Sequence, residues 1–167
     1  MTRIVLIGAP GSGKSTVGVA LAAHLQWPFV DTDALIELKE QKKITDLFVE
    51  NGEEYFRKVE FETLNEVLQE TSAVISLGGG APISQPAQDA LVSSNSTIVF
   101  LDVALATAAP RVGFNRDRPL LLGNPRAQWQ ALSELRRPIY EKLATQSIKV
   151  DDMSVDEIIA IIESNLP

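Results

Sequence analysis

The chain has 167 residues, of which 45% are hydrophobic and 22% charged, and its formal net charge is −7. This length predicts a single domain, residues 1–167, with a sizeable core of its own. The acidic balance argues against nucleic acid or an anionic membrane as a partner. The lack of cysteine excludes disulfides, thiolate metal sites and a cysteine nucleophile, and a single histidine excludes a histidine-rich metal site.

Short apolar runs alternate with helical patterns along the chain. The predicted strands are Arg3–Ile7, Phe29–Asp31, Ala73–Leu77, Thr97–Asp102 and Ser147–Val150. The predicted helices are Lys14–Leu25, Asp33–Gln41, Thr45–Glu50, Glu53–Glu70, Gln85–Val92, Arg126–Thr145 and Val155–Asn165. Several of the strands are apolar throughout, as parallel strands covered on both faces are. The alternation predicts an α/β fold with a doubly wound parallel sheet.

Residues 8–15 read Gly-Ala-Pro-Gly-Ser-Gly-Lys-Ser and fit G-x-x-x-x-G-K-[ST] between a strand and a helix. The glycines let successive N–H groups face phosphate oxygens, and the helix N-terminus adds a positive dipole end. Lys14 would reach the β- and γ-phosphates, and the Ser15 hydroxyl would bind Mg²⁺. The candidate nucleotide-binding residues here are Gly11, Ser12, Gly13, Lys14, Ser15 and Thr16. The alternative is a glycine-rich turn, which does not require Gly-Lys-Ser at the helix start.

The apolar run before this motif is too short to span a membrane. It continues directly into a motif that needs the strand intact, so we do not interpret it as a signal peptide. The expectation is a cytoplasmic protein.

Two acidic residues, Asp31 and Asp33, follow the second predicted strand. In open α/β sheets, ligands bind outside the carboxyl ends of the strands. One carboxylate could hold Mg²⁺ through water while the other accepts a proton from an attacking hydroxyl. The alternative is that Asp33 or Thr32 caps the next helix.

Gly78, Gly79 and Gly80 follow the third predicted strand and leave room for a ligand close to the backbone, unless they form an ordinary flexible turn. Arg57 lies near a helix start, where the macrodipole disfavours cations. Glu53 and Glu60 are spaced to hold its guanidinium, which is also the pattern of a surface ion-pair ladder.

The arginines are concentrated in one window. Six of the eight lie between positions 111 and 137, where the net charge is +4 against −11 for the rest of the chain. They form either a solvated helix face or a site for phosphate or carboxylate. Within this window, Gly113–Pro125 lacks periodicity and is predicted to be a long loop, often a lid in compact domains. His24, Trp27 and Trp129 are interpreted as structural or packing residues.

Together these motifs resemble the shikimate kinase family, in the nucleoside-monophosphate-kinase-like branch of P-loop proteins. They are Asp31-Thr32-Asp33, Ile44-x-x-Leu47-Phe48-x-x-x-Gly52-Glu53-x-x-Phe56-Arg57-x-x-Glu60, Ser76-Leu77-Gly78-Gly79-Gly80, Arg118-Pro119-Leu120-Leu121 and Arg136-Arg137-Pro138-Ile139-Tyr140. The match covers nearly the whole chain in the family's order. It implies three layers around a five-stranded parallel sheet of order 2-3-1-4-5, a substrate-binding helical segment at about 33–61, a lid at about 112–125 and a monomer.

The resemblance implies an enzyme that transfers the γ-phosphoryl group of ATP to the 3-hydroxyl of shikimate. On the acceptor side, Asp33 matches the acid that binds the shikimate hydroxyls and is the proposed base. Arg57 and Arg136 match the pair that grips the shikimate carboxylate, and Glu60 matches the acid that orients Arg57. The remaining acceptor-side residues are Phe48 and Phe56, which line the ring, and Gly78, Gly79 and Gly80, among which Gly79 matches the backbone contact to substrate.

On the donor side, the resemblance gives catalytic roles to Lys14 and to Arg118, the lid arginine that moves onto the phosphates. It places Arg111 near the adenine and implies that Ser15 and Asp31 hold Mg²⁺. Pro110 directly precedes Arg111 and is expected to kink or end a helix there.

Three alternatives remain open from the residues alone. Another small-molecule kinase, such as a gluconate or nucleotide kinase, would share the P-loop, but an uncharged polyol would not need two arginines. A nucleotide-dependent switch module would hydrolyse ATP slowly, without a small-molecule acceptor, and bind a protein partner. A pseudoenzyme is disfavoured by intact Lys14, Ser15, Asp33 and Arg118.

Overall fold

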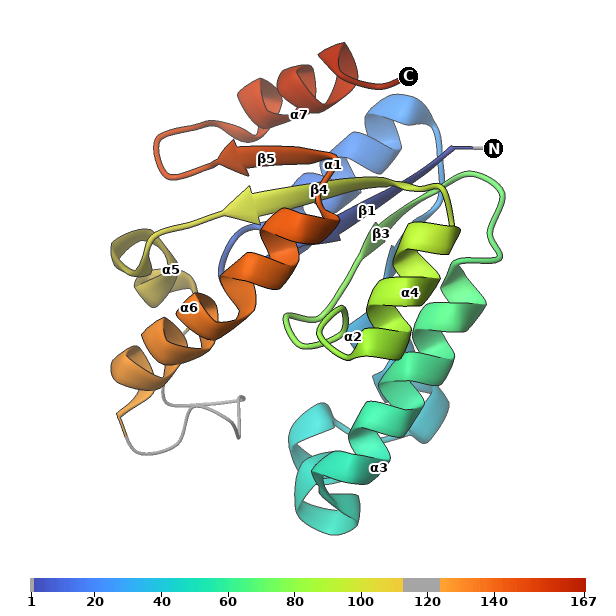
Figure 1. Cartoon of the computed structure of the whole chain (residues 1–167), viewed down its shortest axis with the longest axis vertical. Helices are drawn as coiled ribbons and strands as arrows, with labels where there is room; N and C mark the ends of the chain where they lie inside the picture. The colour runs from blue at the N-terminus through green and yellow to red at the C-terminus, as the bar shows by residue number, and fades with distance from the viewer. Residues whose placement is uncertain (1, 113–123) are drawn as a thin grey trace.

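The computed structural model describes residues 2–112 and 124–167, which form a parallel sheet between two helical layers (Figure 1). The strands are β1 (Arg3–Ile7), β2 (Phe29–Asp31), β3 (Ala73–Ser76), β4 (Thr97–Asp102) and β5 (Gln146–Lys149). The helices are α1 (Lys14–Leu25), α2 (Thr32–Glu40), α3 (Ile44–Val67), α4 (Gln85–Ser93), α5 (Leu105–Val112), α6 (Pro125–Leu143) and α7 (Val155–Ser164). The strand order β2-β3-β1-β4-β5 is the predicted one.

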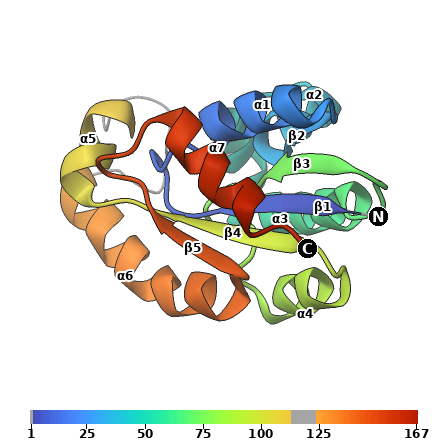
Figure 2. The same ribbon diagram turned by 90° about the horizontal axis from the view of Figure 1, so that it is seen from above.

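Alternate residues of the strands serve the two faces of the sheet. Ile4 and Leu6 of β1 pack with α1 and α7, whereas Val5 and Ile7 pack with α3, α4 and α6. Figure 2 shows the same division, with α1 and α7 on one side of the sheet and α4 and α6 on the other. Because both faces are covered, the three inner strands β1, β3 and β4 are apolar at nearly every position, whereas the edge strand β5 has one buried apolar residue, Ile148.

The carboxyl ends of the strands form the edge at which functional residues gather. Asp31, the last residue of β2, pairs in register with Ser76, the last residue of β3. The loop after β1 is the P-loop, and it returns into α1 at the same edge. The topology therefore places the P-loop, the Asp31–Asp33 segment and the three glycines beside one another.

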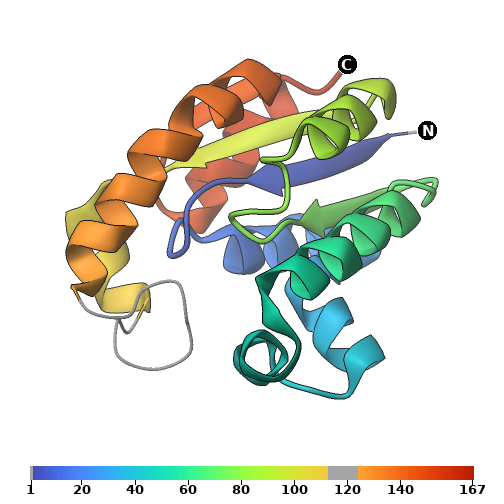
Figure 3. The same cartoon turned by 60° about the horizontal axis from the view of Figure 1, so that its bottom comes forward.

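Several predicted boundaries need correction. β3 and β5 end at Ser76 and Lys149, one residue earlier than predicted. The two helices predicted around position 50 are confirmed: α3 consists of two helical parts that meet at a bend at Gly52, where φ is 84° and ψ 168°. The bend separates the two parts of α3 in Figure 3. The prediction overlooked α5, which contains Pro110 within it rather than ending before it.

Two further features differ in detail from the expectations. Asp31, not Thr32 or Asp33, caps α2, because its carboxylate accepts the N–H groups of Asp33 and Ala34. His24 lies on the surface and faces Glu163 of α7, 2.9 Å away. Ser154 caps α7 in a full capping box with Glu157. Within residues 2–112 and 124–167, no helix is long and apolar enough to cross a membrane.

Candidate active site

The P-loop, residues 8–15, curls tightly around the Lys14 side chain. Gly11 and Gly13 have φ values of 82° and 92°, which side chains disfavour. Lys14 Nζ donates hydrogen bonds to the carbonyl oxygens of Gly8 and Ala9, at 2.8 and 3.0 Å. The loop thereby carries a fixed ammonium group at the N-terminal end of α1, where a phosphate group is favoured.

Ser15 and Asp31 meet beside the P-loop. The Ser15 hydroxyl donates to Asp31 Oδ2 at 2.7 Å, while Asp31 Oδ1 accepts the N–H of Asp33 at 2.9 Å. Asp31 therefore caps the N-terminus of α2 with one carboxylate oxygen and directs the other toward Ser15 of the P-loop. A hydroxyl and a carboxylate are oxygen ligands of the kind that Mg²⁺ prefers. Among the described residues, no group of three or more histidine or acidic side chains lies close enough to hold a metal alone.

The three glycines after β3 leave space for three different functional side chains. A Cβ atom on Gly78 would lie 2.6 Å from Asp33 Oδ1. A Cβ on Gly79 would lie 3.2 Å from Arg136 Nη1, and one on Gly80 would collide with the Arg57 guanidinium. The turn is therefore the point at which Asp33, Arg57 and Arg136 converge. The space beside the glycines is thus used by these side chains, and the predicted approach of a ligand to the backbone stays a prediction.

Arg57 is held by carboxylates of its own helix, as the spacing predicts. Its Nη1 lies 2.8 Å from Glu60 Oε1 and its Nε 3.6 Å from Glu53 Oε1. Glu60 is 5% exposed, and burial raises its pKa, against which the neighbouring Arg57 guanidinium acts to lower it. Arg136, on α6, is also buried, at 8% exposure. The Glu60 carboxylate and the Arg136 guanidinium are buried beside a cavity, whereas Arg57 is half-buried. Buried charges beside a cavity favour a site for a charged ligand over a surface ladder.

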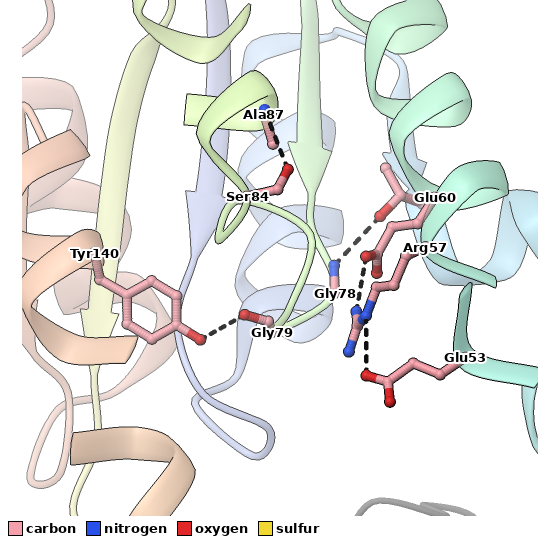
Figure 4. A network of polar contacts seen from close by, with 9 residues as sticks. Glu53, Arg57, Glu60, Gly78, Gly79, Ser84, Ala87 and Tyr140 are labelled. Atoms are coloured by element: carbon pink, nitrogen blue, oxygen red, sulfur yellow. Dashed lines mark hydrogen bonds and ion pairs between the residues drawn. The ribbon is translucent and has the colours of Figure 1, made fainter. Parts of the chain in front are cut away.

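Tyr140 fixes the glycine turn from the opposite side. Its hydroxyl donates to the Gly79 carbonyl at 2.6 Å, and burial raises its pKa to about 12, so it remains a donor. Figure 4 shows Tyr140 reaching the turn from α6, with Arg57, Glu60 and Glu53 facing it from α3. No spacing in the sequence predicts this contact of Tyr140, because its partner Gly79 lies 61 residues away.

An aromatic wall flanks this group. The rings of Phe48 and Phe56 are 4.7 Å apart, and the Arg57 guanidinium lies 5.3 Å from the centre of the Phe56 ring. Phe48 and Phe56 stand on the two parts of α3 separated by the bend at Gly52. The bend therefore lets one helix present both rings to the same cavity.

Two adjoining cavities meet at this edge of the sheet. The larger has a volume of about 690 Å³, and its wall includes Asp33, Phe48, Phe56, Arg57, Glu60, Gly78, Gly79, Gly80 and Arg136. The smaller, of about 500 Å³, is bounded by the P-loop, Thr16 and Arg111, with Met153, Val155 and Ile158 at its apolar side. Ser15, Asp31, Asp33, Gly78 and Gly79 line both cavities. This arrangement offers two ligand sites with a shared boundary at which a group could pass from one to the other.

The arginines of positions 111–137 divide among different tasks. Arg111 donates from α5 to the Gly11 carbonyl at 3.2 Å, beside the smaller cavity. Arg136 lines the larger one, and Arg137 turns away to pair with Asp102 at 2.6 and 2.8 Å. Arg118 and the predicted lid core, 113–123, lie outside the described residues. One further residue, Trp129, donates its indole N–H to the Pro10 carbonyl, a contact that packing alone did not predict.

The chain is similar over its whole length to known proteins of one kind. The family model "Shikimate kinase" matches residues 10–166. A shikimate kinase of Thermobifida fusca is 45% identical, over 98% of this chain and 94% of that protein. A shikimate kinase of Rhodococcus erythropolis is 39% identical, over 98% of this chain and 96% of that protein. The solved structure of a shikimate kinase from Acinetobacter baumannii in complex with shikimate has a TM-score of 0.91 at 30% identity, covering 99% and 95% of the two chains.

Proposed function

The chain belongs to the shikimate kinase family, and on that premise we propose how its two cavities divide the transfer of the γ-phosphoryl group of ATP to the 3-hydroxyl of shikimate. The products are shikimate 3-phosphate and ADP. ATP occupies the smaller cavity, along the P-loop, and shikimate occupies the larger one. The observation that carries this assignment is the convergence of Asp33, Arg57 and Arg136 on the glycine turn next to the P-loop.

The donor side holds the phosphates by backbone and by charge. The N–H groups of residues 11–16 and the Lys14 ammonium balance negative charge on the phosphoryl oxygens, which is where phosphoryl transfer gains most of its rate. Ser15 and Asp31 fit a Mg²⁺ ion, since their oxygens already lie together beside the P-loop. When bound, Mg²⁺ would supply further charge stabilisation to the phosphates. Arg111 flanks the adenine, and Arg118 acts on the phosphates as the resemblance implies.

The acceptor side recognises a carboxylate and hydroxyls on one small ring. Arg57 and Arg136 hold the carboxylate, because paired guanidinium groups match its geometry. Glu60 keeps Arg57 in place, and Phe48 and Phe56 line the ring. Asp33 lies where both cavities meet. It accepts a hydrogen bond from the 3-hydroxyl and takes its proton as the oxygen attacks phosphorus.

We propose that the enzyme is a monomer in the cytoplasm, since both cavities are formed within one acidic chain. Residues 33–61 form the acceptor-binding segment and 112–125 the lid, which would exclude water as a competing acceptor. Size-exclusion chromatography with light scattering tests the monomer directly. A stable dimer would contradict it.

The first experiment is ADP formation from Mg·ATP in a coupled assay. Shikimate, gluconate and nucleoside monophosphates are each offered as acceptor, with a no-acceptor control. Stimulation by shikimate alone supports the proposed reaction and the carboxylate clamp. Stimulation by gluconate or a nucleotide instead would retain the kinase chemistry and overturn the acceptor. Nucleotide binding with no stimulation by any acceptor would favour a switch module.

A further inference from the structure

The P-loop is tied to α6 by one buried side chain. Trp129, in the first turns of α6, donates its indole N–H to the carbonyl oxygen of Pro10 at 2.8 Å, across 119 residues of sequence. The Trp129 side chain is 2% exposed. Trp129 belongs to the same core cluster as Ala9 of the P-loop and Ala108 of α5.

Trp129 has an unusual place in the core. Farther along α6, Tyr140 and Leu143 pack on one face of the sheet with β1 residues Val5 and Ile7. Trp129 instead belongs to the cluster of the opposite face, with Ile4 and Leu6. The helix thus passes the carboxyl edge of the sheet and reaches the P-loop with its first turns, as Figure 1 shows for the end of α6 near α5.

The accepting carbonyl belongs to a peptide unit of the nucleotide site. The Pro10–Gly11 peptide is trans, like every peptide bond described. A trans peptide is planar and carries its C=O and N–H on opposite sides. A donor that fixes the Pro10 carbonyl therefore also fixes the direction of the Gly11 N–H, a group of the phosphate-binding loop. Gly11 has φ of 82° and no side chain, so its own conformation restrains this peptide weakly.

The next peptide along the loop, Gly11–Ser12, is braced from a second side. Arg111 of α5 donates to the Gly11 carbonyl at 3.2 Å. A Cβ on Gly11 would lie 2.8 Å from Val112 Cγ2, so α5 packs directly on the loop there. Residues 10 and 11 are therefore held between α5 and α6, and the hydrogen bond from Trp129 is the contact that α6 supplies.

We propose that Trp129 is a positioning residue of the donor site: by holding the Pro10 carbonyl it orients the Pro10–Gly11 peptide for the phosphates of ATP. It touches neither substrate in this role. The test by KM values rests on the proposed function, whereas the test by the Kd for ADP requires only that the chain binds a nucleotide. Trp129 also borders the larger cavity. A simple wall residue there would affect the acceptor, so the two roles make opposite predictions.

The test uses Trp129→Phe, which keeps an aromatic ring and removes the donor. Trp27→Phe is the matched control, because Trp27, the other tryptophan, lies just before β2 at the opposite ends of the strands. We expect the Kd for ADP and the KM for ATP to rise roughly three- to tenfold in Trp129→Phe, as for one lost hydrogen bond. The KM for shikimate should change less than about twofold, and Trp27→Phe should match the parent.

Two results would overturn the proposal. An unchanged Kd for ADP would mean that the bond only satisfies a buried N–H. Equal losses for ADP and shikimate would mean that the ring acts as a wall. Calorimetric titration of ADP needs no acceptor. It therefore decides the role of Trp129 even if shikimate fails to stimulate the parent chain, which would reject the proposed function separately.

A second variant separates the hydrogen bond from the shape of the ring. In the Trp27→Phe chain, position 129 is the only tryptophan, and it can be replaced by benzothienylalanine, whose sulfur stands where the indole N–H was. This residue preserves the packing that Phe partly loses. The same loss of ADP affinity is expected, and retention of full ADP affinity would show that shape alone matters and overturn the proposal.

Discussion

The donor and acceptor halves of the cleft are built in different ways. The donor half comes from one continuous segment, residues 8–16, in which backbone groups, glycine conformations and one lysine do the binding. The acceptor half uses side chains from α2, α3 and α6, which meet only because the glycine turn leaves room for them. In the proposed function, a local motif thus makes the general site for a triphosphate, and a long-range assembly makes the specific site for the acceptor.

This difference predicts which parameter each substitution changes. A change in the donor half should lower the rate and leave acceptor affinity intact, since its groups face the phosphates. A change in the acceptor half should weaken shikimate binding and leave the ATP constants near their starting values. A substitution that alters both halves equally would break the comparison.

The largest effect is expected from Lys14→Met. The methionine keeps the length of the side chain and removes the charge that balances the transferred phosphoryl group. We expect kcat to fall about a thousandfold, as for loss of a key electrostatic contact in a transition state. The Kd for shikimate, measured by calorimetry, should stay unchanged. Lys142→Met on α6 serves as the control, and a comparable loss in shikimate affinity would contradict the division.

Next in size is Arg136→Ala. Removing one half of the carboxylate clamp should lower kcat/KM for shikimate roughly a hundredfold, mainly through KM, with little change in the KM for ATP. Steady-state kinetics with each substrate varied would measure both constants. The neighbouring Arg137→Ala is the control, because Arg137 pairs with Asp102. This substitution should lower the free energy of unfolding by about 1 kcal/mol at most, without changing either KM. Equal rises in the two KM values for Arg136→Ala would refute the clamp.

A smaller effect is expected from Gly79→Ala. The new Cβ would lie 3.2 Å from Arg136 Nη1 and 3.3 Å from Pro10 Cδ, so the guanidinium must shift slightly. We expect the KM for shikimate to rise about tenfold, since misplacing a binding group by a fraction of an ångström is costly. Thermal unfolding would show whether the fold is retained. A variant with wild-type KM and wild-type stability would show that the turn does not set the position of Arg136.

The smallest effect concerns stability, in Glu60→Gln. Burial raises the pKa of Glu60 above its usual 4.5, so the folded state binds this proton more tightly than the unfolded state does. The favourable contribution is full below pH 4.5 and is lost as the pH rises through the folded pKa. The free energy of unfolding of the parent, relative to Glu60→Gln, should therefore fall with rising pH. Urea unfolding of both proteins at several pH values would measure this difference in the free energy of unfolding. If the difference between parent and Glu60→Gln grew with rising pH, the prediction would be wrong.

The strands of the sheet could be predicted because their own residue types indicate a strand. β1, β2 and β4 match their predicted bounds. For β1 and β4 the reason is that strands buried on two faces are short, apolar and β-branched. α5 was not predicted because Pro110 counts against a helix. The helix forms nonetheless, and Ala108 is completely buried beside Gly11. Val112 and Ala108 of this helix lie against Gly11 of the P-loop, a contact between segments about 100 residues apart.

The candidate site divides in the same way. The P-loop and the Arg57–Glu60 pair could be predicted, because their partners lie within a few residues along the chain. The contacts of Trp129 with Pro10 and of Tyr140 with Gly79 could not, because each joins segments more than 60 residues apart. Such pairs are set by how α6 crosses the edge of the sheet, and spacing within a motif carries no information about that.

The bend in α3 has a consequence for chirality. Nothing lies within 4 Å of a Cβ placed on Gly52, so an L-alanine there would meet no obstacle and would still be strained, because φ is 84°. The mirror image of this backbone conformation lies in the extended region that L-residues favour. A semisynthetic enzyme with D-alanine at position 52 should therefore keep its bend and the placement of Phe48 and Phe56, whereas its epimer with L-alanine at that position should not.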